Sequence, residues 1–368
     1  MTNKIIFLSL ITLSALMAHT DDPLVKPEVP LFSFKDKLHF YGDARIRHQE
    51  VQRDDKDSVY QGRYRIRLGT SYDISDNMVF EAQTSSGKGN PTSGNVKVDD
   101  GIDLNKFKFD IVDVDYKEGK NRYKVGRSKY LFYRAIKSQL IWDNDIRLDG
   151  LMYGYKDEDR FTLGVAKLNR LELEDNPNTK DIYMLTAQYI HQLQQENGHL
   201  NIGTGIYHYE GIKGNTAPYA KGALGNSYTN GVYEHDYTIL ELSAEESFSN
   251  VLGKPLKLAS TFAYNSAVSQ HNFAYDVSAK LGSTKKDYDW QVGYTYRKLE
   301  RDAVYAAHND SDFIAGGSDG RGHIITTKMR VSKHMDVAGH FQWSKKFIDS
   351  AKPEADYHRI MLDMILKF

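Results

Sequence analysis

Apolar and polar residues alternate along most of the chain after residue 37. In the first such stretch, residues 38–47, the even positions are apolar or small and the odd positions are mostly polar or charged. The next stretch, residues 62–70, repeats the pattern with Tyr64, Ile66 and Leu68 on the apolar side. A period of two is typical of a β-strand with one face in water and one face out of it. The sequence therefore predicts strands that each have a wet face and a dry face.

The same period recurs to the end of the chain. The dry positions of the later stretches are Tyr183, Leu185, Ala187 and Tyr189; Phe273, Tyr275, Val277, Ala279 and Leu281; Tyr288, Trp290, Val292, Tyr294 and Tyr296; Val337, Phe341 and Trp343; and Ile360, Leu362, Met364, Leu366 and Phe368. Within residues 106–116 the phase shifts between Ile111 and Val112, which predicts a β-bulge there.

The connections between the predicted strands alternate in length. Short connections are expected near 75–77, 117–121, 156–160, 192–199, 249–255, 283–287 and 332–334, and long polar segments at 48–59, 85–105, 128–144, 168–181, 210–235, 266–272, 300–322 and 345–355. Short turns at one rim and long loops at the other are typical of transmembrane β-barrels. The sequence therefore predicts an all-β, antiparallel up-and-down barrel of about 16 strands over residues 38–368, with short periplasmic turns and long extracellular loops.

The first residues predict export. Lys4 precedes an apolar run from Ile5 to Met17, and Ala18 is followed by polar residues. This arrangement is typical of a secretory signal peptide, and the run is shorter than the roughly 20 apolar residues of a membrane-spanning helix. We expect a signal peptide over residues 1–18 and a periplasmic N-terminal lead over residues 19–37. An uncleaved helical anchor is the alternative.

Composition favours a membrane barrel over a soluble secreted protein. Charged residues make up 26% of the chain, which also contains 25 Tyr, 28 Gly, 8 Pro and no Cys. A transmembrane barrel is polar on average because only alternate residues face lipid. A soluble β-sandwich, the alternative, needs neither unequal rims nor an aromatic-rich face. The net charge of −1 and the absence of a basic tail give no sign of a nucleic-acid partner.

Several stretches resemble the proteobacterial "putative porin" family of outer-membrane β-barrels. They are Gly42-Asp43-Ala44-Arg45-Ile46-Arg47, Arg63-Tyr64-Arg65-Ile66-Arg67-Leu68-Gly69, Trp142-Asp143-Asn144-Asp145-Ile146-Arg147-Leu148-Asp149-Gly150-Leu151, Tyr296-Arg297-Lys298-Leu299-Glu300-Arg301-Asp302-Ala303-Val304, Asp310-Ser311-Asp312-Phe313 and Gly316-Gly317. The resemblance is spread over residues 40–368, apart from the region near 190–260. It implies a barrel and a pore but no particular substrate.

The chain ends at Phe368, the last dry-face residue of the last predicted strand. A terminal aromatic residue on an alternating strand resembles the signal that the bacterial barrel-assembly machinery recognises. The resemblance implies this machinery, together with outer-membrane lipid and lipopolysaccharide, as partners.

Five arginines occupy wet positions on the first two predicted strands: Arg45, Arg47, Arg63, Arg65 and Arg67. An arginine facing lipid costs about 2–4 kcal/mol at the bilayer midplane, so these side chains are expected to line the lumen. Clustered guanidinium groups raise the local anion concentration in a narrow pore, which predicts a wall that favours anions. The alternative is that the arginines pair with lumenal carboxylates and only brace the barrel. The candidate carboxylates are Asp43, Glu81, Asp113 and Asp115.

One long loop is expected to fold inward, because an unobstructed barrel of about 16 strands encloses a wide aqueous channel. Segment 128–144 is favoured because it mixes aromatic and basic groups, and segments 85–105 and 210–235 are alternatives. The candidate constriction residues are Lys129, Tyr130 and Arg134, accompanied by Phe132 and Tyr133.

Two further patterns are weaker evidence for a functional site. The loop with Asp310, Ser311, Asp312 and Asp319 could hold Ca²⁺, but its incomplete ligand series favours a solvated surface loop. Ser269-Gln270-His271 places a serine and a histidine close together on a loop, which is weak evidence for a hydrolase, so no enzymatic activity is expected. The histidines show no HExxH motif, and neither a metal nor a cofactor is expected.

The sequence thus predicts a porin in the bacterial outer membrane that allows passive diffusion of small hydrophilic solutes or ions. A substrate-selective channel and a non-conducting surface or adhesion barrel are the alternatives. Barrels of this size often form homotrimers, a point that the sequence leaves open.

Overall fold

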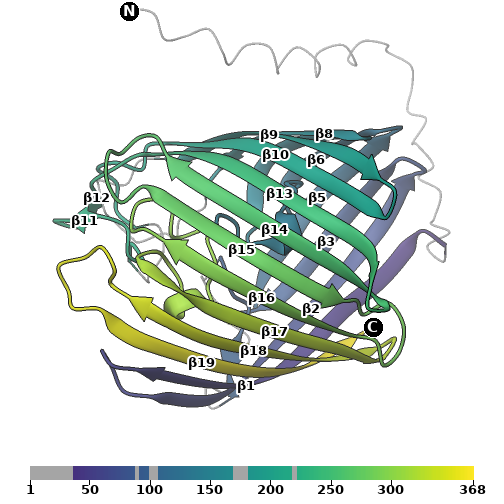
Figure 1. Ribbon diagram of the computed structural model, residues 1–368. Coiled ribbons are helices and arrows are strands. Elements are labelled where there is room, and N and C mark those ends of the chain that lie inside the picture. Colours follow the sequence, from purple (N-terminus) through teal and green to yellow (C-terminus); the bar gives the residue numbers. More distant parts are fainter. Residues whose placement is uncertain (1–35, 88–90, 99–106, 169–180, 218–221) are drawn as a thin grey trace, which may run out of the picture. The chain divides into compact units, whose positions relative to one another are not determined.

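The computed structural model describes residues 36–87, 91–98, 107–168, 181–217 and 222–368. The expected signal peptide and all but the last two residues of the expected periplasmic lead lie outside these residues. No helix in these ranges is long and apolar enough to cross a membrane. In these ranges the chain forms one large antiparallel sheet and one small two-stranded sheet (Figure 1).

Sixteen strands of the described chain form the wall of a closed barrel. They are β1 (Leu38–Arg53), β2 (Val59–Ser75), β3 (Met78–Ser86), β5 (Phe107–Glu118), β6 (Asn121–Ser128), β7 (Leu148–Lys156), β8 (Asp159–Lys167), β9 (Tyr183–Gln195), β10 (Gly198–Glu210), β13 (Tyr237–Val251), β14 (Lys254–Asn265), β15 (Phe273–Gly282), β16 (Trp290–Leu299), β17 (Gly320–Ser332), β18 (Met335–Lys346) and β19 (Ala355–Lys367). Each strand pairs with its neighbours in the chain, and β1 pairs with both β2 and β19, which closes the barrel. The predicted barrel of about 16 strands is confirmed.

The connections at one rim are mostly longer than those at the other, as predicted. The connections at the long-loop rim are loop 1 (54–58), loop 2 (87–106), loop 3 (129–147), loop 4 (168–182), loop 5 (211–236), loop 6 (266–272), loop 7 (300–319) and loop 8 (347–354). The connection 283–289 at the short-turn rim, however, is as long as loop 6 and longer than loop 1. Loop 2 contains β4 (Val96–Lys97), which pairs with β2, and loop 5 contains the hairpin of β11 (Tyr228–Thr229) and β12 (Val232–Tyr233). Loop 1 is shorter than the predicted segment 48–59, because residues 48–53 continue β1 in register with β19.

The dry side of the alternation points out of the barrel. Large apolar side chains exposed there include Phe40, Ile46, Leu68, Leu163, Leu185, Leu242, Val277, Trp290 and Leu362. Their neighbours in the strands face inward, and many of them, such as Arg47 and Glu241, are buried. The outward surface therefore has the apolar character that contact with hydrocarbon requires.

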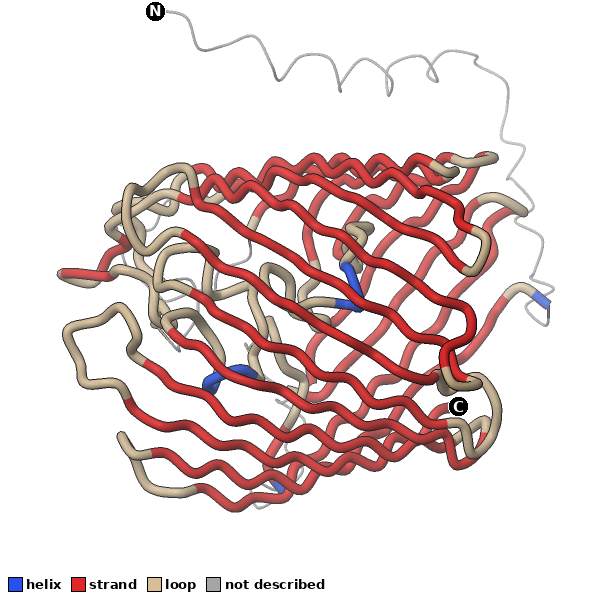
Figure 2. The backbone as a smooth tube through the Cα atoms, viewed as in Figure 1, coloured by secondary structure: helices blue, strands red, loops and turns tan. Residues whose placement is uncertain are grey.

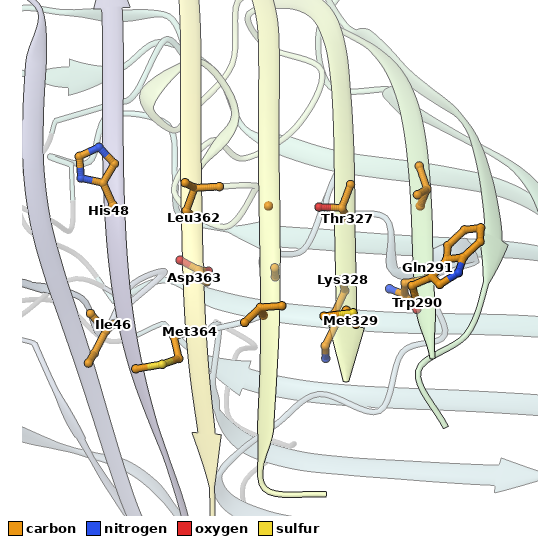
Figure 3. A pocket seen from close by; sticks show the side chains of 14 residues that line it. Ile46, His48, Trp290, Gln291, Thr327, Lys328, Met329, Leu362, Asp363 and Met364 are labelled. Carbon is orange, nitrogen blue, oxygen red and sulfur yellow. The ribbon is translucent and has the colours of Figure 1, made fainter. Parts of the chain in front are cut away.

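A groove of about 650 Å³ lies on this outward surface between β1 and β16–β19 (Figure 3). Its floor includes Gly339, which pairs with Thr327 on one side and with Leu362 on the other. Ile46 and Met364 stand on adjoining strands and line the same groove. Because the outward-facing rows of these strands form it, the groove belongs to the lipid-facing surface and is separate from the lumen.

β5 contains a bulge close to the predicted position. Gln83 of β3 pairs with Ile111 and Thr84 pairs with Phe109, which leaves Asp110 as the extra residue. Asp110 and Ile111 are both buried, so the bulge turns two consecutive side chains inward. The predicted bulge is confirmed, although it lies at Asp110 rather than between Ile111 and Val112.

The end of the chain closes the seam between β1 and β19. The backbone N–H of Gly42 donates to the carbonyl of Phe368 at 2.9 Å, and the N–H of Phe368 donates to the carbonyl of Gly42 at 3.2 Å. A Cβ on Gly42 would lie 2.6 Å from the Phe368 ring. Gly42 therefore gives the terminal ring room to pack over the seam.

Candidate pore constriction

Two long loops fold into the barrel and meet there (Figure 2). Loop 3, the segment favoured from the sequence, contains the short 3-10 helix η4 (Ala135–Lys137). Loop 7, which was not expected to enter the barrel, contains the 3-10 helix η5 (Phe313–Ala315). The constriction therefore involves a loop that the sequence did not indicate.

Direct hydrogen bonds join loops 3 and 7 into one body, here called the loop bridge. The N–H of Asp143 donates to the carbonyl of His308 at 2.7 Å, and the N–H of Asp310 donates to the carbonyl of Gln139 at 3.1 Å. The carboxylate of Asp143 also accepts a hydrogen bond from the N–H of Ser311 at 2.8 Å.

The loop bridge has an aromatic core of its own. Trp142 is 1% exposed, and its ring lies 5.1 Å from the rings of Phe132 and Tyr207 and 5.5 Å from the ring of His308. Phe313 of loop 7 is fully buried in the same cluster. Burial lowers the pKa of His308 to about 3, so its ring is neutral at neutral pH. The loop bridge is therefore packed like a protein interior and not like a solvated loop.

One side of the loop bridge is attached to β9 and β13. The N–H of Tyr133 donates to the side-chain oxygen of Gln188 at 2.8 Å. The N–H of Ile136 donates to the carboxylate of Glu245 at 2.6 Å. These bonds hold the tip of loop 3 against the wall.

Arg297 on β16 connects both loops to the same side. It donates to Asp276 on β15 at 2.7 Å and to Asp310 of loop 7 at 2.7 Å. Asp276 also accepts a hydrogen bond from the hydroxyl of Ser138 in loop 3 at 2.6 Å. Arg297 is 3% exposed, so these are buried, charge-assisted contacts.

The other side of the loop bridge meets the arginine wall, which we define as Arg45, Arg47, Arg63, Arg65 and Arg67 on β1 and β2. Arg47 donates to Asp363 on β19 at 2.7 Å and lies 3.4 Å from the carboxylate of Asp312 in loop 7. Arg359 on β19 lies 3.2 Å from the same carboxylate. Loop 7 is thus fixed between β1 and β19.

Loop 3 contacts the arginine wall through a second carboxylate. Arg65 and Arg67 share Asp43 at 2.8 and 2.6 Å, and both lie close to Asp145 of loop 3, at 3.5 and 3.6 Å. Asp43 is therefore a partner of the arginines, as the bracing interpretation anticipated.

The remaining two arginines of the wall hold loop 2. Arg45 donates to the side-chain oxygen of Asn95 at 2.6 Å, and Arg63 donates to the Asn95 carbonyl at 3.4 Å. All five arginines therefore contact polar groups. Arg47 lies within 4 Å of a carboxylate of loop 7, and Arg65 and Arg67 lie within 4 Å of a carboxylate of loop 3.

The other candidate carboxylates do not reach the arginine wall. Glu81 accepts a hydrogen bond from the hydroxyl of Tyr41. Asp113 pairs with Lys124 at 2.7 Å, and Asp115 pairs with Arg122 at 2.8 Å. Sequence reasoning missed three further partners of the arginine wall, Asp145, Asp312 and Asp363. The first two lie in the motifs quoted above, but nothing local in the sequence indicates which arginine each one meets.

The candidate residues of loop 3 mainly stabilise the loop itself. The hydroxyl of Tyr130 donates to the carbonyl of Asp143 at 2.9 Å, and the guanidinium of Arg134 lies 5.2 Å from the centre of the Tyr130 ring. Arg134 also donates to the carbonyl of Trp142 at 2.9 Å. Lys129 directly follows the end of β6.

The interpretation of residues 310–319 as a solvated surface loop is wrong. Asp310 and Asp319 are each 4% exposed, and Asp310 and Asp312 pair with arginines as described above. The carboxylate of Asp310 is buried because the guanidinium of Arg297 compensates its charge, and the carboxylate of Asp319 accepts a hydrogen bond from the N–H of Asp349 at 2.7 Å. Among the residues that the structure describes, no cluster of three or more side chains is arranged to hold a metal ion. The histidine of the Ser269-Gln270-His271 stretch lies in loop 6, and its ring is 3.2 Å from the carboxylate of Asp349.

Comparison with known families identifies the chain. The model of the "putative porin" family matches residues 44–238 and 230–368. The chain belongs to this family. The porin is therefore an outer-membrane channel for passive diffusion and not an enzyme, as the sequence predicted. No curated protein sequence matches it.

Solved structures show that the porin shares its fold with other outer-membrane barrels. OprB of Pseudomonas putida superposes with a TM-score of 0.59 at 12% identity, covering 91% of this chain and 95% of that one. OmpF of Salmonella typhi in complex with daunomycin gives 0.54 at 11% identity, covering 92% and 99%. OmpT of Vibrio cholerae in a trimer form gives 0.51 at 11% identity, covering 90% and 99%. At these identities the likeness concerns the fold alone.

Proposed function

We propose that the protein is a constricted porin, in which the loop bridge narrows the lumen and restricts diffusion to small hydrophilic solutes. The observation that supports this function most directly is that the loop bridge is fixed to the wall at several strands. It contacts β13, β15 and β16 through Glu245, Asp276 and Arg297, and it contacts β1, β2 and β19 through the arginine wall and Arg359. In the closed sheet, β17 and β18 lie between these two groups of strands on the shorter path, and η5 of loop 7 also packs against β18.

The arginine wall, in this proposal, acts mainly as a brace for the loop bridge. Each guanidinium is directed by short contacts to a particular oxygen, and Arg47 and Arg65 are largely buried. Removing one partner of a buried ion pair typically costs about 3–5 kcal/mol, because the other charge stays buried without compensation. Such contacts keep two long loops inside a water-filled barrel.

Planar-bilayer recording tests this function. Wild-type protein is compared with the double variant Asp145→Asn/Asp312→Asn, which keeps the size of both side chains but removes the charges that join the loop bridge to the arginine wall. Step currents are expected from both proteins, with larger steps from the variant because the loop bridge is released. The control is Asp157→Asn, which alters an exposed carboxylate at a short turn. A silent membrane would support a non-conducting surface barrel, and equal step sizes would show that the loop bridge does not limit conduction.

Assembly is the second part of the proposal. We infer export by a signal peptide over residues 1–18, recognition of Phe368 by the barrel-assembly machinery, and a homotrimer in contact with lipid and lipopolysaccharide. The trimer form of OmpT and the packing of Phe368 over Gly42 support it. The mass of the detergent-extracted particle distinguishes a trimer from a monomer. Phe368→Ala is expected to lower the folded amount in the outer membrane, whereas the exposed-turn variant Lys333→Ala should leave it unchanged.

A further inference from the structure

A second group of cations faces the lumen on another part of the wall. A crevice of about 260 Å³ lies between the tip of loop 3 and the inner side of β15–β18. Its charged lining residues are Lys137, Lys280, Lys328, Arg297, Asp276 and Asp310. We call this site the lysine crevice. Cations outnumber carboxylates among these residues, so the lining is net positive.

Among the described residues, two of these four cations pair with carboxylates of the protein and two do not. Arg297 binds Asp276 and Asp310, and Lys328 lies 2.8 Å from Asp336. Within the described parts of the chain, Lys137 and Lys280 form no ion pair. Their ammonium groups are therefore available to a solute in the lumen.

A neighbouring lysine adds to the positive potential. Lys257 on β14 is the direct cross-strand neighbour of Lys280. Lys257 pairs with Glu245 at 2.5 Å. Lys137, Lys257 and Glu245 all interact electrostatically with Lys280. Like charges this close repel one another, and a bound anion relieves the repulsion.

The backbone at the tip of loop 3 presents Lys137 to the crevice. Ile136 and Lys137 both have positive φ angles, 49° and 63°, a conformation that is rare for residues other than glycine and especially for β-branched ones. The bond from the N–H of Ile136 to Glu245 holds this conformation in place. Strained backbone of this kind persists where the surrounding structure determines it and clusters at functional sites.

The floor of the crevice provides space and neutral hydrogen-bond donors. Gly293 lies between Lys280 and Thr326 in the cross-strand row, and the hydroxyl of Thr326 lies against Gly293, 2.7 Å from where a Cβ would be. The hydroxyls of Ser278 and Thr295 lie next to each other, 2.9 Å apart, and both residues line the crevice. A volume of about 260 Å³ equals roughly eight or nine waters at about 30 Å³ each, enough for a phosphate or a short dicarboxylate.

We propose that the lysine crevice is a binding subsite for small oxyanions, carboxylate or phosphate, on their way through the pore. The ammonium groups of Lys137 and Lys280 attract the oxyanion, and the hydroxyls of the floor orient it. Flexible ammonium groups suit this task, because a permeant solute must bind well enough to enter and weakly enough to leave. The proposal rests on the proposed function, since the inward-folded loop 3 supplies Lys137.

The test measures how oxyanions change the current through purified, full-length protein in planar bilayers. Succinate and inorganic phosphate are titrated separately in a constant chloride background, and the concentration that halves the current is determined for each. The variants are Lys137→Gln, Lys280→Gln and their combination. Lys280→Arg retains the charge, and Lys333→Gln removes a lysine from an exposed short turn as the matched control.

Wild type is expected to show half-block by at least one of the two anions, and each Gln variant to raise the half-blocking concentration by about fivefold, the effect of a partly exposed charge pair. Lys280→Arg and Lys333→Gln should behave as wild type. Block by phosphate alone or by succinate alone identifies the preferred oxyanion.

Equal half-blocking concentrations in wild type and both Gln variants, with normal step currents, would overturn the subsite and leave the constricted porin intact. A larger step size in Asp145→Asn/Asp312→Asn would then still support the loop bridge. A silent membrane for wild type would overturn both.

Discussion

The arginine wall and the lysine crevice are both groups of cations in one lumen, but they differ in what their charges contact. The guanidinium groups of Arg47, Arg65 and Arg67 have carboxylate partners at 2.6–2.8 Å from the protein itself. Lys137 and Lys280 form no ion pair in the described chain. A planar guanidinium with five donors suits fixed, multi-partner contacts, whereas an ammonium on a flexible stem suits exchange with solute.

The number of lumenal cations therefore does not by itself indicate anion selectivity. The five arginines are the more conspicuous group in the sequence, yet their contacts point to a structural role. The lysines lie far apart in the sequence and become a group only when loop 3 folds against β14 and β15. A cation that pairs with a carboxylate of the protein attracts an anionic solute less than a cation without such a pair does.

The largest expected effect comes from breaking the arginine wall. Arg47→Ala leaves Asp363 and Asp312 with reduced compensation, and we expect a loss of about 3–5 kcal/mol in the free energy of unfolding. Urea unfolding in lipid vesicles, followed by tryptophan fluorescence, measures it. Arg122→Ala, which breaks the more exposed pair with Asp115, is the control and should cost much less. Equal losses would show that Arg47 is not a special brace.

Exchanging arginine and lysine, which keeps the charge, tests the difference between the arginine wall and the lysine crevice more finely. Arg65→Lys cannot reach Asp43 and Asp145 together, so we expect a loss of about 1–2 kcal/mol, the value of a hydrogen bond to a charged group. The same unfolding measurement on Lys280→Arg should stay within about 0.5 kcal/mol of wild type, because no fixed partner is lost. A larger loss for Lys280→Arg than for Arg65→Lys would reverse the assignment of the two regions.

A pH effect is expected through the core of the loop bridge, which both regions contact. Burial lowers the pKa of His308 from 6.5 to about 3, so the unfolded chain binds more protons between these values. The contribution of His308 is complete above pH 6.5 and is lost as the pH falls towards 3. His308→Phe should therefore lose less stability than wild type between pH 7 and pH 4.5. Identical losses would show that His308 is solvated.

The outward surface could be predicted residue by residue because lipid and water sort neighbouring side chains locally. Trp290, Val277 and Leu362 were assigned to the dry face from the period of two alone, and all three are exposed on the outer wall. The bulge was predicted for the same reason, since a phase shift is visible in the sequence. The predicted position of the bulge was wrong because its extra residue, Asp110, is polar like the inward-facing residues around it.

The interior of the barrel could be predicted only in part, because it depends on contacts between distant segments. Arg47 and Asp312 are 265 positions apart in the sequence, and Asp145 of loop 3 is likewise distant in sequence from Arg65 on β2. The sequence of loop 7 shows no regular alternation of apolar and polar residues, so its acidic residues indicated a solvated surface loop. Only the arginines that it meets explain why Asp310 and Asp312 lie inside the barrel.

The most direct test of the constricted pore uses the absence of cysteine from the chain, which lets a single introduced thiol be modified selectively. Current through Lys137→Cys is recorded before and after a negatively charged methanethiosulfonate reagent is added, with Lys333→Cys as the control. The account predicts step currents from both proteins and a clear fall in step size at position 137 only. An unchanged step size after complete labelling of Lys137→Cys would mean that loop 3 does not border the conducting path.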